Sequence, residues 1–105
     1  MKRVAAFSFR SRLALEDLFA KLNELGPWRW IERDNDRFGG YISARALPEP
    51  DYGIVKIFVE PDHYVVDLVL ESDAHTKLDA VYDTLFTYLL PALGANDVRE
   101  TDHRE

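Results

Sequence analysis

Two stretches of this chain decide its fold: Ile54-Val55-Lys56-Ile57-Phe58-Val59 and Tyr64-Val65-Val66-Asp67-Leu68-Val69-Leu70. A strand with one buried and one solvated face alternates apolar and polar residues, because successive side chains point to opposite faces. Neither stretch alternates in this way, since apolar residues occupy both faces and only Lys56 and Asp67 interrupt the second one. The pattern predicts two neighbouring strands with more apolar surface than one layer of helices covers.

The two stretches are expected to form a hairpin around Glu60-Pro61-Asp62-His63, a segment rich in turn formers. One face of this hairpin is entirely apolar and consists of Val55, Ile57, Val59, Tyr64, Val66, Leu68 and Leu70. On the other face, a loop of two or four residues sets Lys56 opposite Asp67, whereas a loop of three residues sets Ile57 opposite Asp67. We predict the first register, because a cross-strand pair of opposite charges contributes about 0.2–1 kcal/mol.

A strand and a helix are predicted ahead of this hairpin. Val4 to Phe9 is typical of a short strand, and from about Arg12 to Leu25 the apolar residues recur at helical spacing. Ser11 is the expected N-cap of this helix. Gly26-Pro27 is expected to end it, with the glycine in a left-handed conformation.

A second hairpin is predicted from Trp28–Glu32 and Phe38–Arg45, on either side of a charged turn. A loop of two or four residues pairs Trp30 with Tyr41 and so places both aromatic side chains on one face. Gly39-Gly40 within the second strand predicts a bulge or the close approach of another group. Packing under the helices is the expected role of the two tryptophans.

The second helix is predicted from about His75 to Leu90, with Ser72 or Asp73 as its cap and Pro91 near its end. The order β-α-β-β-β-β-α predicts an α+β fold, with an antiparallel sheet of about five strands and two helices packed on one face. Residues 1–98 are expected to form this single domain, and residues 99–105 a charged, frayed tail.

This order of elements resembles one half of the TATA-binding protein fold and, more loosely, the helix-grip ligand-binding domains. The resemblance covers the element order alone, so no functional residue is carried over from either family. The net charge of −6 also departs from what a DNA-binding half requires.

Composition excludes several classes of function. The chain has 105 residues and no cysteine, which excludes disulfides and thiolate metal sites. Its net charge of −6 opposes binding to a phosphate backbone, and no apolar run is long enough to span a bilayer. The short apolar stretch after Met1 is below the length of a signal peptide, so the cytoplasm is the expected compartment.

The sequence contains no motif of a reactive site. The histidines His63, His75 and His103 have no zinc-ligand spacing, and the serines lack a nucleophile motif. Asp62 and His63 are neighbours in a predicted turn, where their side chains are expected to diverge. We therefore predict no catalytic residue, no metal and no cofactor, while enzymatic activity stays open.

The second sheet face is the predicted site of function, because exposed apolar patches mark interfaces. Its predicted partner-binding residues are Ile31, Phe38, Ile42, Ile54, Lys56, Phe58, Val65, Asp67 and Val69. The first hypothesis is a cytoplasmic protein-interaction domain that forms a homodimer through this face or binds another protein there, with no nucleic-acid or membrane partner. The alternative is a small-molecule-binding domain, possibly an enzyme, with a pocket for a hydrophobic ligand between the sheet and the second helix, near Tyr82 and Tyr88.

Overall fold

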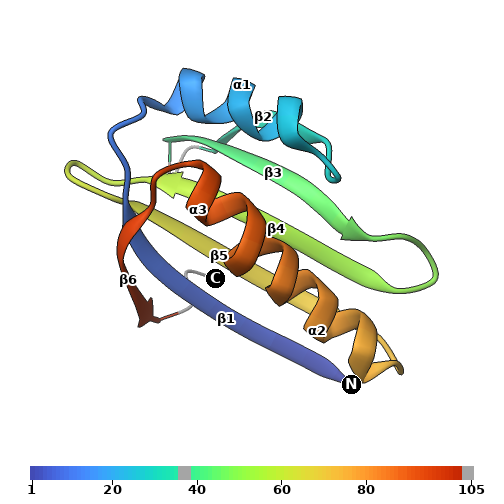
Figure 1. The fold of residues 1–105 in the computed structure, drawn as a ribbon. Coiled ribbons are helices and arrows are strands. Elements are labelled where there is room, and N and C mark those ends of the chain that lie inside the picture. The colour runs from blue at the N-terminus through green and yellow to red at the C-terminus, as the bar shows by residue number, and fades with distance from the viewer. Residues whose placement is uncertain (36–38, 103–105) are drawn as a thin grey trace.

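The structure, a computed structural model, describes residues 1–35 and 39–102 as one antiparallel sheet covered by two helices. The strands are β1 (Lys2–Arg10), β2 (Trp30–Asn35), β3 (Gly39–Leu47), β4 (Tyr52–Val59), β5 (Tyr64–Glu71) and β6 (Asn96–Thr101). The first helix is α1 (Leu15–Leu25), and the second joins α2 (His75–Asp83), the π-helical η1 (Thr84–Leu89) and α3 (Leu90–Ala92). The strands lie in the order β2-β3-β4-β5-β1-β6, and both helices lie on one side of them (Figure 1). The predicted α+β class is confirmed, with one more strand than expected.

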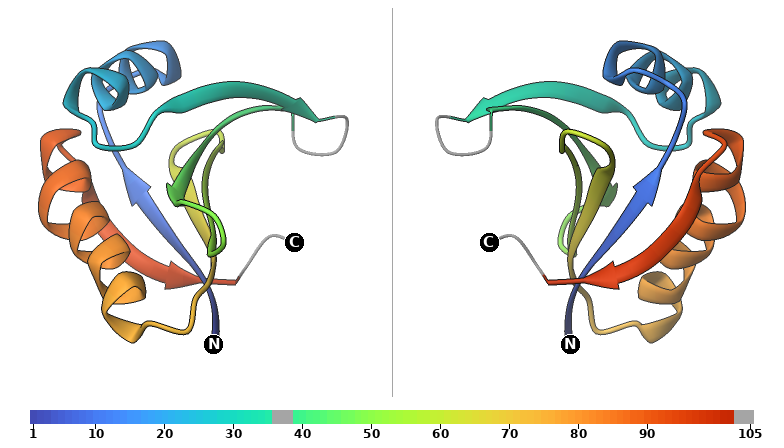
Figure 2. Two further views of the ribbon diagram at one scale, coloured as in Figure 1. Left: turned by 90° about the vertical axis from the view of Figure 1, so that its right-hand side faces the viewer. Right: turned by 90° about the vertical axis from the view of Figure 1, so that its left-hand side faces the viewer.

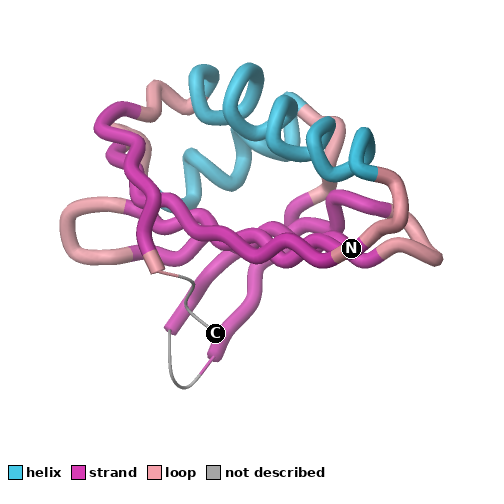
Figure 3. The backbone as a smooth tube through the Cα atoms, turned by 90° about the horizontal axis from the view of Figure 1, so that it is seen from below, coloured by secondary structure: helices cyan, strands magenta, loops and turns pink. Residues whose placement is uncertain are grey.

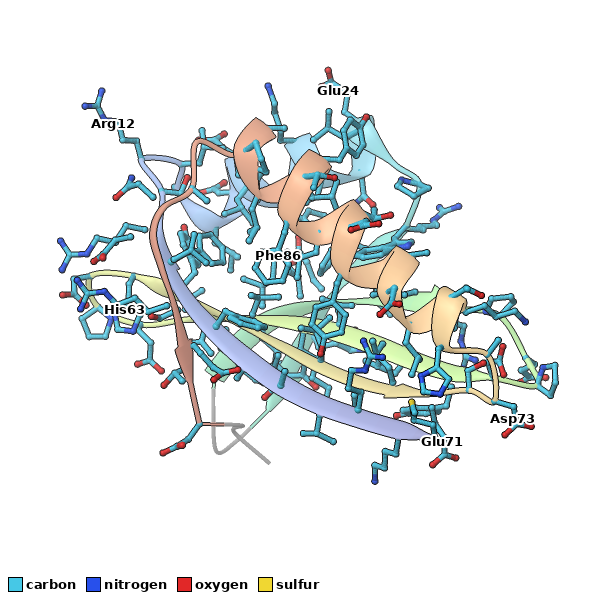
Figure 4. All side chains as sticks on the ribbon, turned by 60° about the horizontal axis from the view of Figure 1, so that its bottom comes forward. Arg12, Glu24, His63, Glu71, Asp73 and Phe86 are labelled. Carbon is cyan, nitrogen blue, oxygen red and sulfur yellow. The ribbon has the colours of Figure 1, made fainter. Side chains whose placement is uncertain are left out.

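The helix-covered face holds the core. Along β4 and β5 the residues predicted for it are buried, apart from Val59 at the end of β4, which is 42% exposed. Leu18 and Leu22 of α1 and Leu85 of the second helix have no exposed surface. Phe86 also points from the second helix toward the sheet (Figure 4) and meets Phe7 edge-on at 4.8 Å between ring centroids. The apolar spacing of both helices therefore predicted correctly which sides they bury.

The register of the hairpin β2–β3 differs from the prediction. Trp30 lies opposite Ala44, not opposite Tyr41, and the ladder runs on to Asn35 and Gly39. In this register Trp30 and Ile42 share the helix-covered face, where they are 2% and 0% exposed. A one-residue slip would turn both side chains to the other face, so their burial sets the pairing more strongly than the turn residues do.

The close approach expected at Gly39-Gly40 occurs at Gly53 instead. No atom lies within 4 Å of a Cβ built on either Gly39 or Gly40, and the β2–β3 ladder has no bulge there. A Cβ on Gly53 would lie 2.8 Å from the Leu47 side chain, beside the register shift that follows Arg45. Gly53, which faces the bulge in β3, is therefore the glycine that close packing requires, whereas Gly39 has open space around it and takes a φ of 74°.

Neither helix has the predicted cap, which was Ser11 for the first helix and Ser72 or Asp73 for the second. The N-caps are Ala14 and Ala74, and neither provides a side-chain hydrogen bond. Ser11 instead donates its hydroxyl to the Leu93 carbonyl at 2.7 Å and so connects the end of β1 to the end of the second helix. The predicted end of α1 is confirmed, because Gly26 has a φ of 64° and donates its N–H to the Leu22 carbonyl.

The edge strand β6 was not predicted. All its residues are exposed, so its sequence lacks the alternation that marks a half-buried strand. It pairs with β1, where Ala6 lies opposite Thr101, and it extends into the segment expected to be a tail. Residues 103–105 lie outside the described part of the chain.

Candidate functional site

The side of the sheet away from the helices, called here the helix-free face, is the candidate site. Figure 3 shows the helices together on one side and the hairpin β2–β3 extending past the sheet on the other. Residues directly opposite each other in an antiparallel ladder share a face. The registers therefore assign to the helix-free face Lys2, Val4, Ala6, Ser8, Ile31, Arg33, Tyr41, Ser43, Arg45, Tyr52, Ile54, Lys56, Phe58, Val65, Asp67, Val69, Glu71, Arg99 and Thr101.

The centre of the helix-free face is buried although no helix covers it. Phe58 is 2% exposed and Val65 is 5% exposed, and the two lie opposite each other on β4 and β5. The Tyr41 ring lies next to Phe58, with 5.0 Å between their centroids. The strongly curved sheet carries β2 and β3 around this side of the molecule (Figure 2). Phe58 and Val65, two of the predicted partner-binding residues, are thus already shielded within one chain.

The predicted pairing of Lys56 with Asp67 is confirmed, since the two residues lie opposite each other in the ladder. Asp67 is 2% exposed, and the Lys56 ammonium lies 5.8 Å from the centroid of the Tyr41 ring. A buried charge is costly unless another charge compensates for it. The β4–β5 register, which we predicted from the charges of these two residues, therefore places two opposite charges side by side in the middle of this face.

An exposed row of side chains crosses four strands beside this centre. Val4, Val69, Ile54 and Arg45 lie in register on β1, β5, β4 and β3. Val4 is 43% exposed, and Val69 and Ile54 are half-buried. Tyr52 extends the row along β4 and is 47% exposed. The row, called here the apolar row, is an exposed strip of the helix-free face beside its buried centre.

The predicted binding residues divide into three groups. The structure brings Ile54, Lys56, Phe58, Val65, Asp67 and Val69 together, and Ile31 lies on the same face with 43% exposure. The placement of Ile42 was wrong, because the β2–β3 register turns it into the core. Phe38 lies outside the described residues. The sequence missed Val4 and Tyr52, which nothing in their immediate neighbourhood distinguishes from ordinary strand residues.

A second group of polar side chains lies where β1, the β4–β5 turn and β6 meet. His63 Nδ1 lies 2.6 Å from Asp62 Oδ1, so these neighbouring side chains meet and do not diverge as expected. Arg10 lies 3.7 Å from Asp62 and 3.8 Å from Asp97, which also contacts Arg99 at 2.8 Å. The hydrogen bond from His63 holds the pKa of the Asp62 carboxyl below its usual value, with a smaller contribution from Arg10. Figure 4 shows His63 at this turn.

This ionic group fits a structural role. It encloses a hollow of about 220 Å³ that Ser8 and Phe9 also line. Each of its carboxylates faces at least one cation, and Asp97 takes the unusual φ of 54° beside the irregular pairing of β6. The contacts join an all-exposed edge strand to its neighbours. Among residues 1–35 and 39–102, no three His, Asp or Glu side chains gather as metal ligands would.

The region proposed for a hydrophobic ligand, between the sheet and the second helix, is packed with side chains. Leu78, Leu85 and Leu89 have no exposed surface. Tyr82 stacks on Phe86, and burial raises the pKa of the Tyr82 phenol. The Tyr88 hydroxyl donates to the Leu25 carbonyl at 3.1 Å. A cavity of about 530 Å³ lies elsewhere, at the turn between α1 and β2, and is lined by both tryptophans.

Comparison with known proteins assigns no function to this arrangement. No protein-family model matches the chain, and no curated protein is significantly similar to it in sequence. In the described part of the chain, no helix has the length and apolar character needed to cross a bilayer. The geometry of the helix-free face is therefore the basis for a proposed function.

Proposed function

We propose that this protein is a non-enzymatic protein-interaction domain that binds a second copy of itself through the helix-free face, in the cytoplasm. The observation that supports this proposal is the apolar row, whose apolar side chains cross three strands, β1, β5 and β4, on the one sheet face without helices and end beside Arg45 on β3. Exposed apolar groups that form a continuous patch are typical of interaction surfaces, whereas isolated ones are ordinary. A second copy offers the same row in a self-complementary arrangement about a twofold axis.

The expected dimer is weak. Phe58 and Val65 are already buried and add little apolar surface to an interface. Association costs an estimated 4–15 kcal/mol in lost freedom, and the few half-exposed groups of the row offset only part of it. Arg33 and Arg45 also lie on this face in both copies. We therefore expect a concentration-dependent equilibrium between monomer and dimer.

Light scattering over a range of protein concentrations tests this proposal. The variant Val4→Glu places a charge in the apolar row and should keep the protein monomeric. Val98→Glu is the matched control, because Val98 lies outside the row on the adjacent strand β6 and is 42% exposed against 43% for Val4. A parent protein that stays monomeric at every concentration, or equal effects of the two variants, would contradict the homodimer.

A further inference from the structure

The helix-free face differs in charge from the rest of the molecule. The registers place five cations on it, Lys2, Arg33, Arg45, Lys56 and Arg99, against the two carboxylates Asp67 and Glu71. This face therefore has an excess of three positive charges among the described residues, in a chain whose net charge is −6. Its sign is opposite to that of the molecule as a whole.

Three of these cations are available to a partner. Lys2, Arg33 and Arg45 are exposed, and within the described residues no carboxylate lies within ion-pair distance of any of them. Arg45 ends the apolar row, directly beside Ile54. The guanidinium group binds carboxylates with two parallel hydrogen bonds, so an arginine beside apolar groups suits an acidic, partly apolar segment.

We infer that the helix-free face binds an acidic segment of another protein more tightly than it binds a second copy of this chain. This inference rests on the proposed function, namely that this face binds protein. Two copies bring like charges together across the interface, whereas an acidic segment brings carboxylates to Arg33 and Arg45. The two occupants therefore respond to salt in opposite directions, because screening relieves the repulsion in the first and weakens the attraction in the second.

A labelled oligoglutamate peptide is the probe, and an oligolysine peptide of the same length is its charge control. Fluorescence anisotropy should show that oligoglutamate binds with an affinity that falls as sodium chloride is added, whereas any binding of oligolysine to the acidic rest of the molecule should not depend on Arg45. Amide chemical shifts should change along Arg33, Arg45 and the apolar row. Arg45→Gln should weaken binding about two- to fivefold, the range of an exposed ion pair. Arg12→Gln should not, because Arg12 extends from the β1–α1 turn on the side of the helices (Figure 4).

Three results of these binding experiments would overturn the inference of an acidic partner. Equal effects of Arg45→Gln and Arg12→Gln, or no binding of oligoglutamate at low salt, would overturn the inference. Single-stranded oligothymidylate that binds more tightly than oligoglutamate through the same residues would overturn it in favour of a nucleic-acid surface. A concentration-dependent mass that Val4→Glu abolishes, together with no oligoglutamate binding, would leave the homodimer standing and reject the acidic partner alone.

Discussion

The two faces of the sheet bury apolar residues in different ways. On the helix-covered face, Ile57 lies under the helices and has no exposed surface. On the helix-free face, Phe58 is buried by neighbours within the curved sheet and lies one row from the charges of Lys56 and Asp67. The first face is a dry core, whereas the second is a mixed surface that keeps charged and half-exposed groups. A face with no helix can therefore hide large side chains and still present a surface to a partner.

The largest expected difference in the free energy of unfolding is between substitutions of two isoleucines on one strand. Ile57→Ala should lower the free energy of unfolding by about 2–5 kcal/mol, as expected for a fully buried side chain. Ile54→Ala, on the helix-free face of the same strand, should lower it by about 1 kcal/mol, because Ile54 is only half-buried. Urea unfolding monitored by circular dichroism measures both values. Equal losses would show that the helix-free face is as tightly packed as the core.

The next effect concerns the charged pair in the centre of the helix-free face. Asp67→Leu should destabilise the protein by about 1–3 kcal/mol, because it leaves the half-buried Lys56 without the carboxylate opposite it. Lys56→Leu together with Asp67→Leu should recover most of this loss, since apolar side chains can replace two opposite charges on a largely covered face. A double-mutant cycle measures the coupling. Additive losses would mean that the two residues do not depend on each other.

A smaller effect is expected at the boundary between α1 and the sheet edge. The Asn23 side chain accepts a hydrogen bond from the Trp30 N–H at 2.7 Å and donates one to the Trp30 carbonyl at 3.1 Å. These are the two backbone groups that a residue of a neighbouring strand would bind. Asn23→Ala should cost about 1–2 kcal/mol, because two partly buried hydrogen bonds are lost. The exposed Glu24 is the control position, and Glu24→Ala should change the unfolding free energy by less than about 0.5 kcal/mol. Chemical denaturation of the three proteins tests this difference.

The smallest effect is a dependence on acid pH. The hydrogen bond from Lys77 holds the pKa of the Asp51 carboxyl below its usual value, with a further contribution from Ser72. A carboxyl whose pKa is lower in the folded state stabilises the fold above the unfolded value. That contribution is lost as the pH falls through the folded pKa. Asp51→Asn should therefore lose less stability than the parent between pH 5 and strongly acidic conditions, as thermal unfolding at each pH would show.

The sequence predicted the elements and one register well, for reasons of local chemistry. The helical spacing of α1 and the second helix and the apolar run of β5 are carried by neighbouring residues, so they could be identified without the fold. The pairing of Lys56 with Asp67 could be predicted because the short turn between β4 and β5 allows only a few registers of the hairpin. The register of Trp30 could not be chosen in this way, because it depends on which face of the β2–β3 hairpin is buried in the core, and the turn residues do not specify that face.

The candidate site was predicted only in outline for the same reason. Ile54 and Val69 were placed correctly, since they belong to the hairpin whose register was predicted. Val4 and Arg45 joined them only when β1 and β3 took their places on either side of β4 and β5. The contact between Asp62 and His63 was missed because side-chain directions in a turn follow from backbone geometry that residue types do not specify.

By itself, the sequence determined the class of fold, the two helices and the presence of a second apolar sheet face, because these follow from periodicity and composition. Only the tertiary structure decided how much of that face is covered, which charges surround it and that an all-exposed strand, β6, closes one edge. These features depend on sheet curvature and on contacts between distant segments, and no local pattern of residues specifies either.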